Sequence, residues 1–312
     1  RSDNPPLPTR IVKSKNVRND HSGGLSRRDA LKSAAAASLG VASGAFGVPQ
    51  VGKTPSTRKD HIREENSKKG TRDWRLTKTK TVPGKINKIL DNGRSNAIEG
   101  YCNANSLRAG EKLKIMISAN PASAFKLDIF RTGYYGGTGA RLMKTFDSLE
   151  AGTQPDPPIG ENYLRECQWE PTVELEIPKS WPSGVYLGKM TAGRSGIQSY
   201  VIFIVRDDRP CDFLFQCSDL TWSAYNRWPA DYSIYTPHEK GHSTTGVPSG
   251  TVGFDRPYGL FTHPVNKMMK SGGSGEYLPW EFPLAFWMEE EGYDVSYVSN
   301  LDTHTDPKGL LR

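Results

Sequence analysis

The chain has 312 residues, of which 36% are hydrophobic and 10% aromatic, enough for about two domains of ordinary size. Its net charge of +7 is confined to one end: residues 1–80 carry 18 Lys/Arg against 7 Asp/Glu, which leaves 23 against 27 in residues 81–312. A mildly acidic body excludes a nucleic-acid-binding surface, because phosphate binding needs Lys and Arg clustered on the folded surface. The four cysteines include no CxxC pair, which excludes a disulfide scaffold and a zinc ribbon.

Residues 1–50 carry the pattern of a twin-arginine export signal. The pair Arg27-Arg28 stands ahead of a weakly apolar stretch, residues 33–48, that is rich in Ala, Gly and Ser. This order predicts a protein exported to the periplasm or the exterior, and the alternative is an Ala-rich helix in a soluble arm. The stretch is too short and too rich in Gly and Ser for a permanent membrane span. Retention as an anchor stays open, because no single cleavage site stands out.

Residues 51–81 are rich in Lys, Arg, Ser and Thr, which predicts a basic, disordered linker. From residue 82 to residue 206 the pattern changes to short β runs separated by Gly and Pro. Alternation with period two, loose in the last case, occurs at residues 113–117, 125–130, 173–177 and 186–190. Residues 199–205 form a continuous apolar run suited to a central strand. Short strands at regular spacing predict an immunoglobulin-like β-sandwich.

Residues 207–312 have a different pattern, which predicts the N-terminal part of an α/β domain. A buried strand is expected at residues 212–216, a helix at 280–292 and a second strand at 293–298. Strand, helix and strand in this order favour a parallel sheet. Little follows the second strand that could complete such a domain, so the chain is expected to be a fragment.

The helix at residues 280–292 has clear end signals. Pro283 falls in its first turn and Gly292 at its stop. Leu284, Trp287 and Met288 lie three or four residues apart, so they are expected to form its buried face.

One local motif matches a metal site and is rejected. His238-Glu239-Lys240-Gly241-His242 has the HExxH spacing of zinc proteases, in which the two histidines share one face of a helix. Pro237 precedes the motif, Gly241 lies inside it, and a Ser-, Thr- and Gly-rich stretch follows. A solvated loop is therefore expected here.

The cysteines are expected to be free, buried thiols. Cys211 and Cys217 lie at the two ends of one predicted strand, about 20 Å apart, which is too far for a disulfide bond. Pairing of Cys102 with Cys167 inside the sandwich is the alternative.

Two clusters of aromatic and polar residues are candidate sites. Residues 219–228 directly follow the C-terminal end of a predicted parallel strand, where open α/β sheets place their sites. Residues 253–258 form the second cluster. The alternative for both is packing at a seam between domains.

Seven short motifs follow one another along residues 97–312. They lie at residues 98–101, 106–111, 131–141, 225–228, 254–258, 280–281 and 292–297. The most specific is Arg131-Thr132-Gly133-Tyr134-Tyr135-Gly136-Gly137-Thr138-Gly139-Ala140-Arg141. In this order the motifs resemble those of the N,N-dimethylformamidase large (beta) subunit-like family.

The resemblance implies a β-sandwich followed by an α/β domain similar to glutamine amidotransferases. It also implies a mononuclear ferric iron held by two tyrosines and a glutamate. The tyrosines match Tyr225 and Tyr258, and the glutamate is expected beyond Arg312. Pro229-Ala230 stands where the family pattern has two glycines.

The implied chemistry is physically consistent. Two phenolates and a carboxylate form a hard, anionic ligand set that favours ferric iron and leaves open positions. Such an ion polarises an amide carbonyl and acidifies bound water, the two tasks of hydrolysis. Together with the export signal, the resemblance therefore implies an exported, metal-dependent hydrolase of small amides that acts on a formamide-type C–N bond.

Three residues beside the tyrosines are expected to support them. Asn226, Asp255 and Arg256 could fix the loop or a phenolate through hydrogen bonds. The alternative for Asp255 and Arg256 is a plain ion pair at the surface.

Two other functions compete with the iron hydrolase. A non-catalytic, exported binding or surface protein of the same family would keep the sandwich and lose the site. An α/β enzyme with a cysteine nucleophile would need Cys211 or Cys217 on a strand-to-helix elbow, and neither is predicted to lie on one. The partner expected is a small amide substrate, and a homo-oligomer or a small partner subunit stays open.

Overall fold

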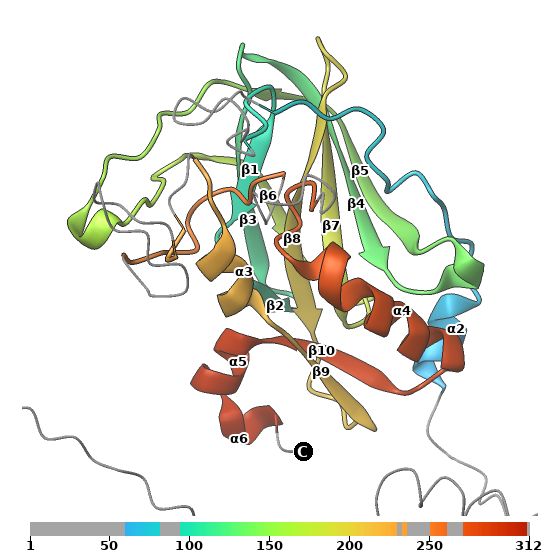
Figure 1. Ribbon diagram of the computed structural model, residues 1–312. Helices are drawn as coiled ribbons and strands as arrows, with labels where there is room; N and C mark the ends of the chain where they lie inside the picture. The colour runs from blue at the N-terminus through green and yellow to red at the C-terminus, as the bar shows by residue number, and fades with distance from the viewer. Residues whose placement is uncertain (1–59, 82–93, 230–232, 236–249, 261–270, 311–312) are drawn as a thin grey trace, which may run out of the picture. The chain divides into compact units, whose positions relative to one another are not determined.

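The computed structural model describes residues 60–81, 94–229, 233–235, 250–260 and 271–310 (Figure 1). They belong to one compact unit, residues 57–312. The predicted export signal with Arg27 and Arg28, the motif at residues 238–242, and Arg312 lie outside the described residues. None of the helices within these ranges combines the length and the apolar content that a bilayer crossing needs.

Two sheets enclose the main hydrophobic core (Figure 1). One is antiparallel and has the order β1-β3-β6; the other has the order β2-β8-β7-β4-β5 and is antiparallel except for the parallel β2–β8 pair. The strands are β1 (Glu99–Cys102), β2 (Ser106–Arg108), β3 (Lys112–Ser118), β4 (Ser123–Thr132), β5 (Ala140–Ala151), β6 (Pro171–Glu176), β7 (Gly184–Ala192) and β8 (Gln198–Arg206). The core is built from inward residues of both sheets, such as Ile115 and Val173 from one and Leu127 and Phe203 from the other.

Strand β8 explains why residues 199–205 are apolar without interruption. Alternate side chains of a strand point to opposite faces. Val201, Phe203 and Val205 lie in the core between the two sheets, and Tyr200, Ile202 and Ile204 lie in a second core on the other face. Because β8 is buried on both faces of the sheet, it cannot carry polar residues at every second position.

The second core is covered by helices and a short parallel sheet (Figure 1). Strands β9 (Phe213–Cys217) and β10 (Val295–Ser299) pair in parallel, as predicted for this part of the chain. The helices are α2 (His61–Asn66), α3 (Asp219–Tyr225), α4 (Phe282–Glu291), α5 (Asn300–Thr305) and α6 (Pro307–Leu310), with short turns η2 (Tyr135–Gly137), η3 (Glu161–Tyr163) and η4 (Tyr277–Glu281). The fold is therefore rich in β-structure with few helices. Immunoglobulin-like and amidotransferase-like classes stay predictions.

Residues 60–81 differ from the disordered linker that their composition predicts. They contain α2, which buries Ile62, and a segment that we call the strap, residues 71–79. The Nε1 of Trp74 donates to the carbonyl of Thr138 at 3.0 Å, and the Nζ of Lys189 donates to the carbonyl of Asp73 at 2.6 Å. The strap is held by hydrogen bonds with residues that lie far away in the sequence, so its own polar composition does not predict its ordered position.

Helix α4 stops at the predicted residue, Gly292, but the face that it buries differs from the predicted one. Gly292 caps it at φ 75°, which favours glycine. Its buried residues are Ala285, Met288 and Glu289, whereas Leu284 is 51% and Trp287 is 47% exposed. Of the predicted face only Met288 is buried, so the prediction was wrong for Leu284 and Trp287. The reason is a buried ion pair made by Glu289.

That ion pair gives a physical role to the motif at residues 131–141. Arg131 and Glu289 are both fully buried, and the guanidinium donates to both carboxylate oxygens, at 2.8 and 3.1 Å. The hydroxyl of Tyr297 donates to the same carboxylate at 2.9 Å, and Arg131 also donates to the carbonyl of Ser183. A Cβ on Gly133 would lie 2.3 Å from Glu289 Oε2, so this position needs glycine. The motif thus fastens α4 to the five-stranded sheet.

Candidate functional site

Helix α3 starts directly after β9 and carries Tyr225 as its last residue. Asp219, fully buried at its start, accepts from Asn105 Nδ2 at 2.6 Å and from the main-chain N–H of Asn300 at 2.5 Å. Burial raises the pKa of Asp219, and these two donors oppose that rise. Asp219 therefore fastens α3 both to the sandwich and to the start of α5.

Asn226 joins the two predicted tyrosine segments. Its Nδ2 donates to the carbonyl of Pro257 at 2.9 Å, and its Oδ1 accepts from the main-chain N–H of Gly259 at 3.1 Å. These bonds lie on either side of Tyr258 in the chain, while Tyr225 immediately precedes Asn226. The segments of the two tyrosines, 33 positions apart in the sequence, are thus adjacent in the fold.

Arg256 supports the same junction from inside. It is 2% exposed and donates to the main-chain carbonyls of Ser223, Asn226 and Trp228, at 3.0, 3.2 and 2.8 Å. These carbonyls lie at the C-terminal end of α3, where a cation is favoured by the helix dipole. Burial lowers the pKa of Arg256 to about 10, so the side chain stays charged at neutral pH.

Asp255 is exposed, whereas its neighbour Arg256 is buried. The main-chain carbonyl of Asp255 accepts from the N–H of Cys167 at 2.6 Å. A surface ion pair between Asp255 and Arg256 does not fit a guanidinium that is buried against three carbonyls.

Tyr258 lies against Trp222 of α3, with ring centroids 6.4 Å apart at 76°. The indole Nε1 of Trp222 donates to Glu281 Oε1 at 2.7 Å, and Glu281 also accepts from the main-chain N–H of Ser218. Burial raises the pKa of Tyr258 well above its usual value, and the carboxylates of Asp219 and Glu281 raise it further. The phenol is therefore neutral unless a cation compensates the phenolate.

Tyr225 is half-buried, and its ring lies 4.9 Å from that of Tyr235. With Tyr258 it supplies two phenol oxygens from neighbouring segments, a donor type that suits a hard ferric ion. Among the described residues no group of three or more His, Cys, Asp or Glu is placed to hold a metal ion. The described residues include both tyrosines that the resemblance implies as ligands, and their role as ligands stays a prediction.

Trp228 connects the end of α3 to the sandwich. Its side chain is fully buried, packs against Trp169 at 5.9 Å and donates to Glu99 Oε2 at 2.8 Å. Burial raises the pKa of Glu99 to about 7, although Arg94 lies 2.7 Å away and opposes the rise. The cluster at residues 219–228 therefore includes a residue, Trp228, that packs between the end of α3 and the sandwich. This is the alternative that the sequence left open.

Sequence reasoning missed Asp219, Glu281 and Glu99 as organisers of this region. Glu99 and Glu281 lie inside the short motifs at residues 98–101 and 280–281, and Asp219 begins the cluster at residues 219–228. Their positions were visible, but the partners Trp222, Trp228 and Asn105 lie 59 to 129 residues away.

The described cysteines are free, as expected. Cys102, Cys167 and Cys217 are buried, and Cys211 is half-buried. Burial raises the pKa of every one of these thiols. Cys217 is the last residue of β9, two positions before the start of α3, so the prediction that neither cysteine lies at a strand-to-helix turn was wrong for Cys217. A nucleophilic cysteine needs a lowered pKa, so neither Cys211 nor Cys217 fits that role.

The comparisons with known proteins bear on the family. A solved structure that is similar over part of the chain is a superoxide reductase (neelaredoxin) from Ignicoccus hospitalis, with a TM-score of 0.20 and 11% identity over 34% of this chain and 82% of that chain. No curated protein matches. The model of the family described as N,N-dimethylformamidase beta subunit-like, C-terminal, matches residues 126–312, more than half of the chain. The resemblance seen in the motifs is thereby confirmed, and the chain belongs to the N,N-dimethylformamidase beta subunit-like family.

Proposed function

We propose that this protein is a metal-dependent hydrolase of small amides, with Tyr225 and Tyr258 as ligands of a mononuclear ferric iron. The family name suggests a function related to amide hydrolysis. The observation that carries the proposal is the bridge by Asn226, which bonds to the residues on both sides of Tyr258 and follows Tyr225 in the chain. The name also refers to a beta subunit, so a further subunit belongs to the proposal.

The residues of this chain would position the two phenols for the metal. When bound, ferric iron supplies the polarisation of an amide carbonyl and the acidification of water. Asn226 and Arg256 hold the segments of the two phenols together. Glu281 orients Trp222, against which Tyr258 packs.

The tyrosines can be tested by removing only their hydroxyls. Phenolate bound to ferric iron absorbs visible light by charge transfer, so the iron-loaded, full-length protein is expected to be coloured. Tyr225→Phe or Tyr258→Phe should bleach or shift the band and lower bound iron, because each removes one anionic ligand while the ring still packs. Absorption spectra and iron analysis measure both effects.

Tyr101→Phe is the matched control. Its buried hydroxyl donates to the carbonyl of Cys167 at 3.1 Å, and Tyr101 is not one of the proposed ligands. This variant should keep its colour and iron while losing about 1 kcal/mol of unfolding free energy. A colourless, iron-free wild-type protein that takes up no added iron would refute the metal site and favour a non-catalytic binding protein.

Export by the twin-arginine route also belongs to the proposal, and it rests on Arg27, Arg28 and the weakly apolar stretch after them. Replacing both arginines by lysine keeps the charge and removes the guanidinium pair that distinguishes this signal. The double variant is expected to remain in the cytoplasm while the wild-type protein leaves it, as cell fractionation would show. Equal export of the two proteins would contradict this route.

A further inference from the structure

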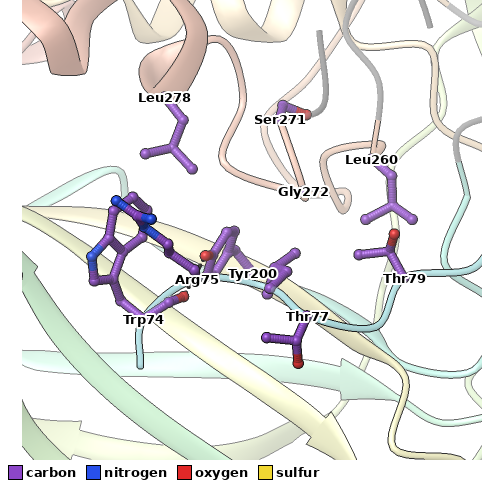
Figure 2. Close-up of a pocket in the computed structure, with 10 residues that line it drawn as sticks. Trp74, Arg75, Thr77, Thr79, Tyr200, Leu260, Ser271, Gly272 and Leu278 are labelled. Atoms are coloured by element: carbon purple, nitrogen blue, oxygen red, sulfur yellow. Dashed lines mark hydrogen bonds between the residues drawn. The ribbon is translucent and has the colours of Figure 1, made fainter. Parts of the chain in front are cut away.

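A separate cavity of about 280 Å³ lies between the strap, β8 and the segment before α4 (Figure 2). Its volume is slightly below the usual range for ligand sites, about 300 to 1,000 Å³, so it suits a small ligand. Trp74 and Arg75 lie together on one side, and Leu278 and Ser271 lie across from them (Figure 2). Neither Tyr225 nor Tyr258 lines this cavity, so it is distinct from the proposed metal site.

The cavity is held in shape by hydrogen bonds around Tyr200. The hydroxyl of Tyr200 donates to the carbonyl of Trp74 in the strap, and its main-chain N–H donates to the carbonyl of Gly272 at 2.8 Å. Gly272 has φ 68°, and a Cβ there would lie 2.7 Å from Leu76 and 3.0 Å from the Tyr200 ring. Glycine therefore lets the two walls close on Tyr200. Because this wall is already fixed, ligand binding does not have to pay an entropy cost for ordering it.

The cavity combines an apolar body with one cationic end. Trp74, Tyr200, Leu260 and Leu278 supply apolar surface. Arg75 is the charged residue among those that line it, and no carboxylate does so in the described part of the chain. The Arg75 guanidinium lies 5.6 Å from the Trp74 ring centroid, within the range of a cation–π contact.

We propose that this cavity binds a small monocarboxylate with a flat apolar body. The guanidinium presents a planar fork of donors that matches the two oxygens of a carboxylate. A ring attached to that carboxylate would fill the space between Tyr200 and Leu278. The proposal does not rest on the proposed metal site or on amide hydrolysis.

The test titrates the full chain with phenylacetate, followed by calorimetry and by tryptophan fluorescence. We expect saturable one-to-one binding with a Kd below about 1 mM, as the size of the ligand allows. Arg75→Gln keeps the length of the side chain and removes its charge. Because Arg75 is exposed, the variant should keep its melting temperature and bind phenylacetate at least about tenfold more weakly.

Arg72→Gln is the matched control. Arg72 lies on the same strap and is exposed, but it lines a neighbouring hollow and not this cavity. Its variant should bind like the wild type, and neutral 2-phenylethanol should bind at least about tenfold more weakly than phenylacetate. An absence of saturation up to about 5 mM, well above the expected Kd of about 1 mM or less, would overturn the proposal. So would equal losses in the two variants, or equal binding of the neutral compound.

Discussion

Replacing Glu289 by glutamine is expected to lower the unfolding free energy by about 3 to 5 kcal/mol. The change leaves the guanidinium of Arg131 fully buried without its carboxylate partner, and an uncompensated buried charge is strongly destabilising. The hydroxyl of Tyr297 also loses a charged acceptor. Urea unfolding, with a slope shared by all variants, measures the effect.

The double variant Arg131→Met, Glu289→Leu separates the cost of an unpaired charge from the value of the pair. Replacing both partners by apolar residues removes the buried charges together, so most of the lost stability should return. Glu290→Gln is the neighbouring control, because Glu290 is exposed and should change the stability by less than about 0.5 kcal/mol. A loss below about 1 kcal/mol in Glu289→Gln would show that Arg131 finds other compensation.

This pair also shows why α4 could be predicted only in part. The ends of the helix depend on Pro283 and Gly292, which act within one turn of their own positions. The buried face depends on Arg131, which lies 158 residues away. Glu289 counts as polar in any hydrophobic pattern, so the pattern favours Leu284 and Trp287 and misses a buried carboxylate.

Strands could be predicted where one face of the strand is buried in the core and the other is more exposed, because the side chains then alternate between apolar and polar. The alternating runs at residues 113–117 and 173–177 became β3 and β6, which line the core between the two sheets. Strand β5 was missed because most of its residues are exposed or half-buried, so they show no apolar alternation. Its position follows from pairing with β4, an interaction that the residues of β5 do not show.

In the candidate site, the sequence predicted which residues support the tyrosines, but it did not predict their hydrogen-bond partners. The sequence indicated that Asn226 and Arg256 support the tyrosines, and the structure gives both of them buried hydrogen bonds at that junction. Neighbours in sequence suggested Asp255 as the partner of Arg256. Main-chain carbonyls are invisible in a sequence pattern, so the acceptors at the end of α3 could not be foreseen.

Replacing Arg256 by leucine is expected to cost about 3 kcal/mol, because three buried carbonyls lose their charged donor. The change also releases the segment of Tyr258 from the end of α3. Iron bound by the full-length protein should therefore fall together with the visible band, even at temperatures far below the melting temperature. Urea unfolding and iron analysis on the same samples separate the two effects.

Arg256→Lys and Asp255→Asn make the comparison specific. Lysine keeps the charge but lacks the planar fork, so it should restore part of the stability and part of the bound iron. Asp255→Asn changes an exposed neighbour and should leave both nearly unchanged, since its fixed contact is made by its main-chain carbonyl. If Arg256→Leu loses stability while the iron content and the band stay at wild-type levels, Arg256 supports the fold and does not position Tyr258 for a metal.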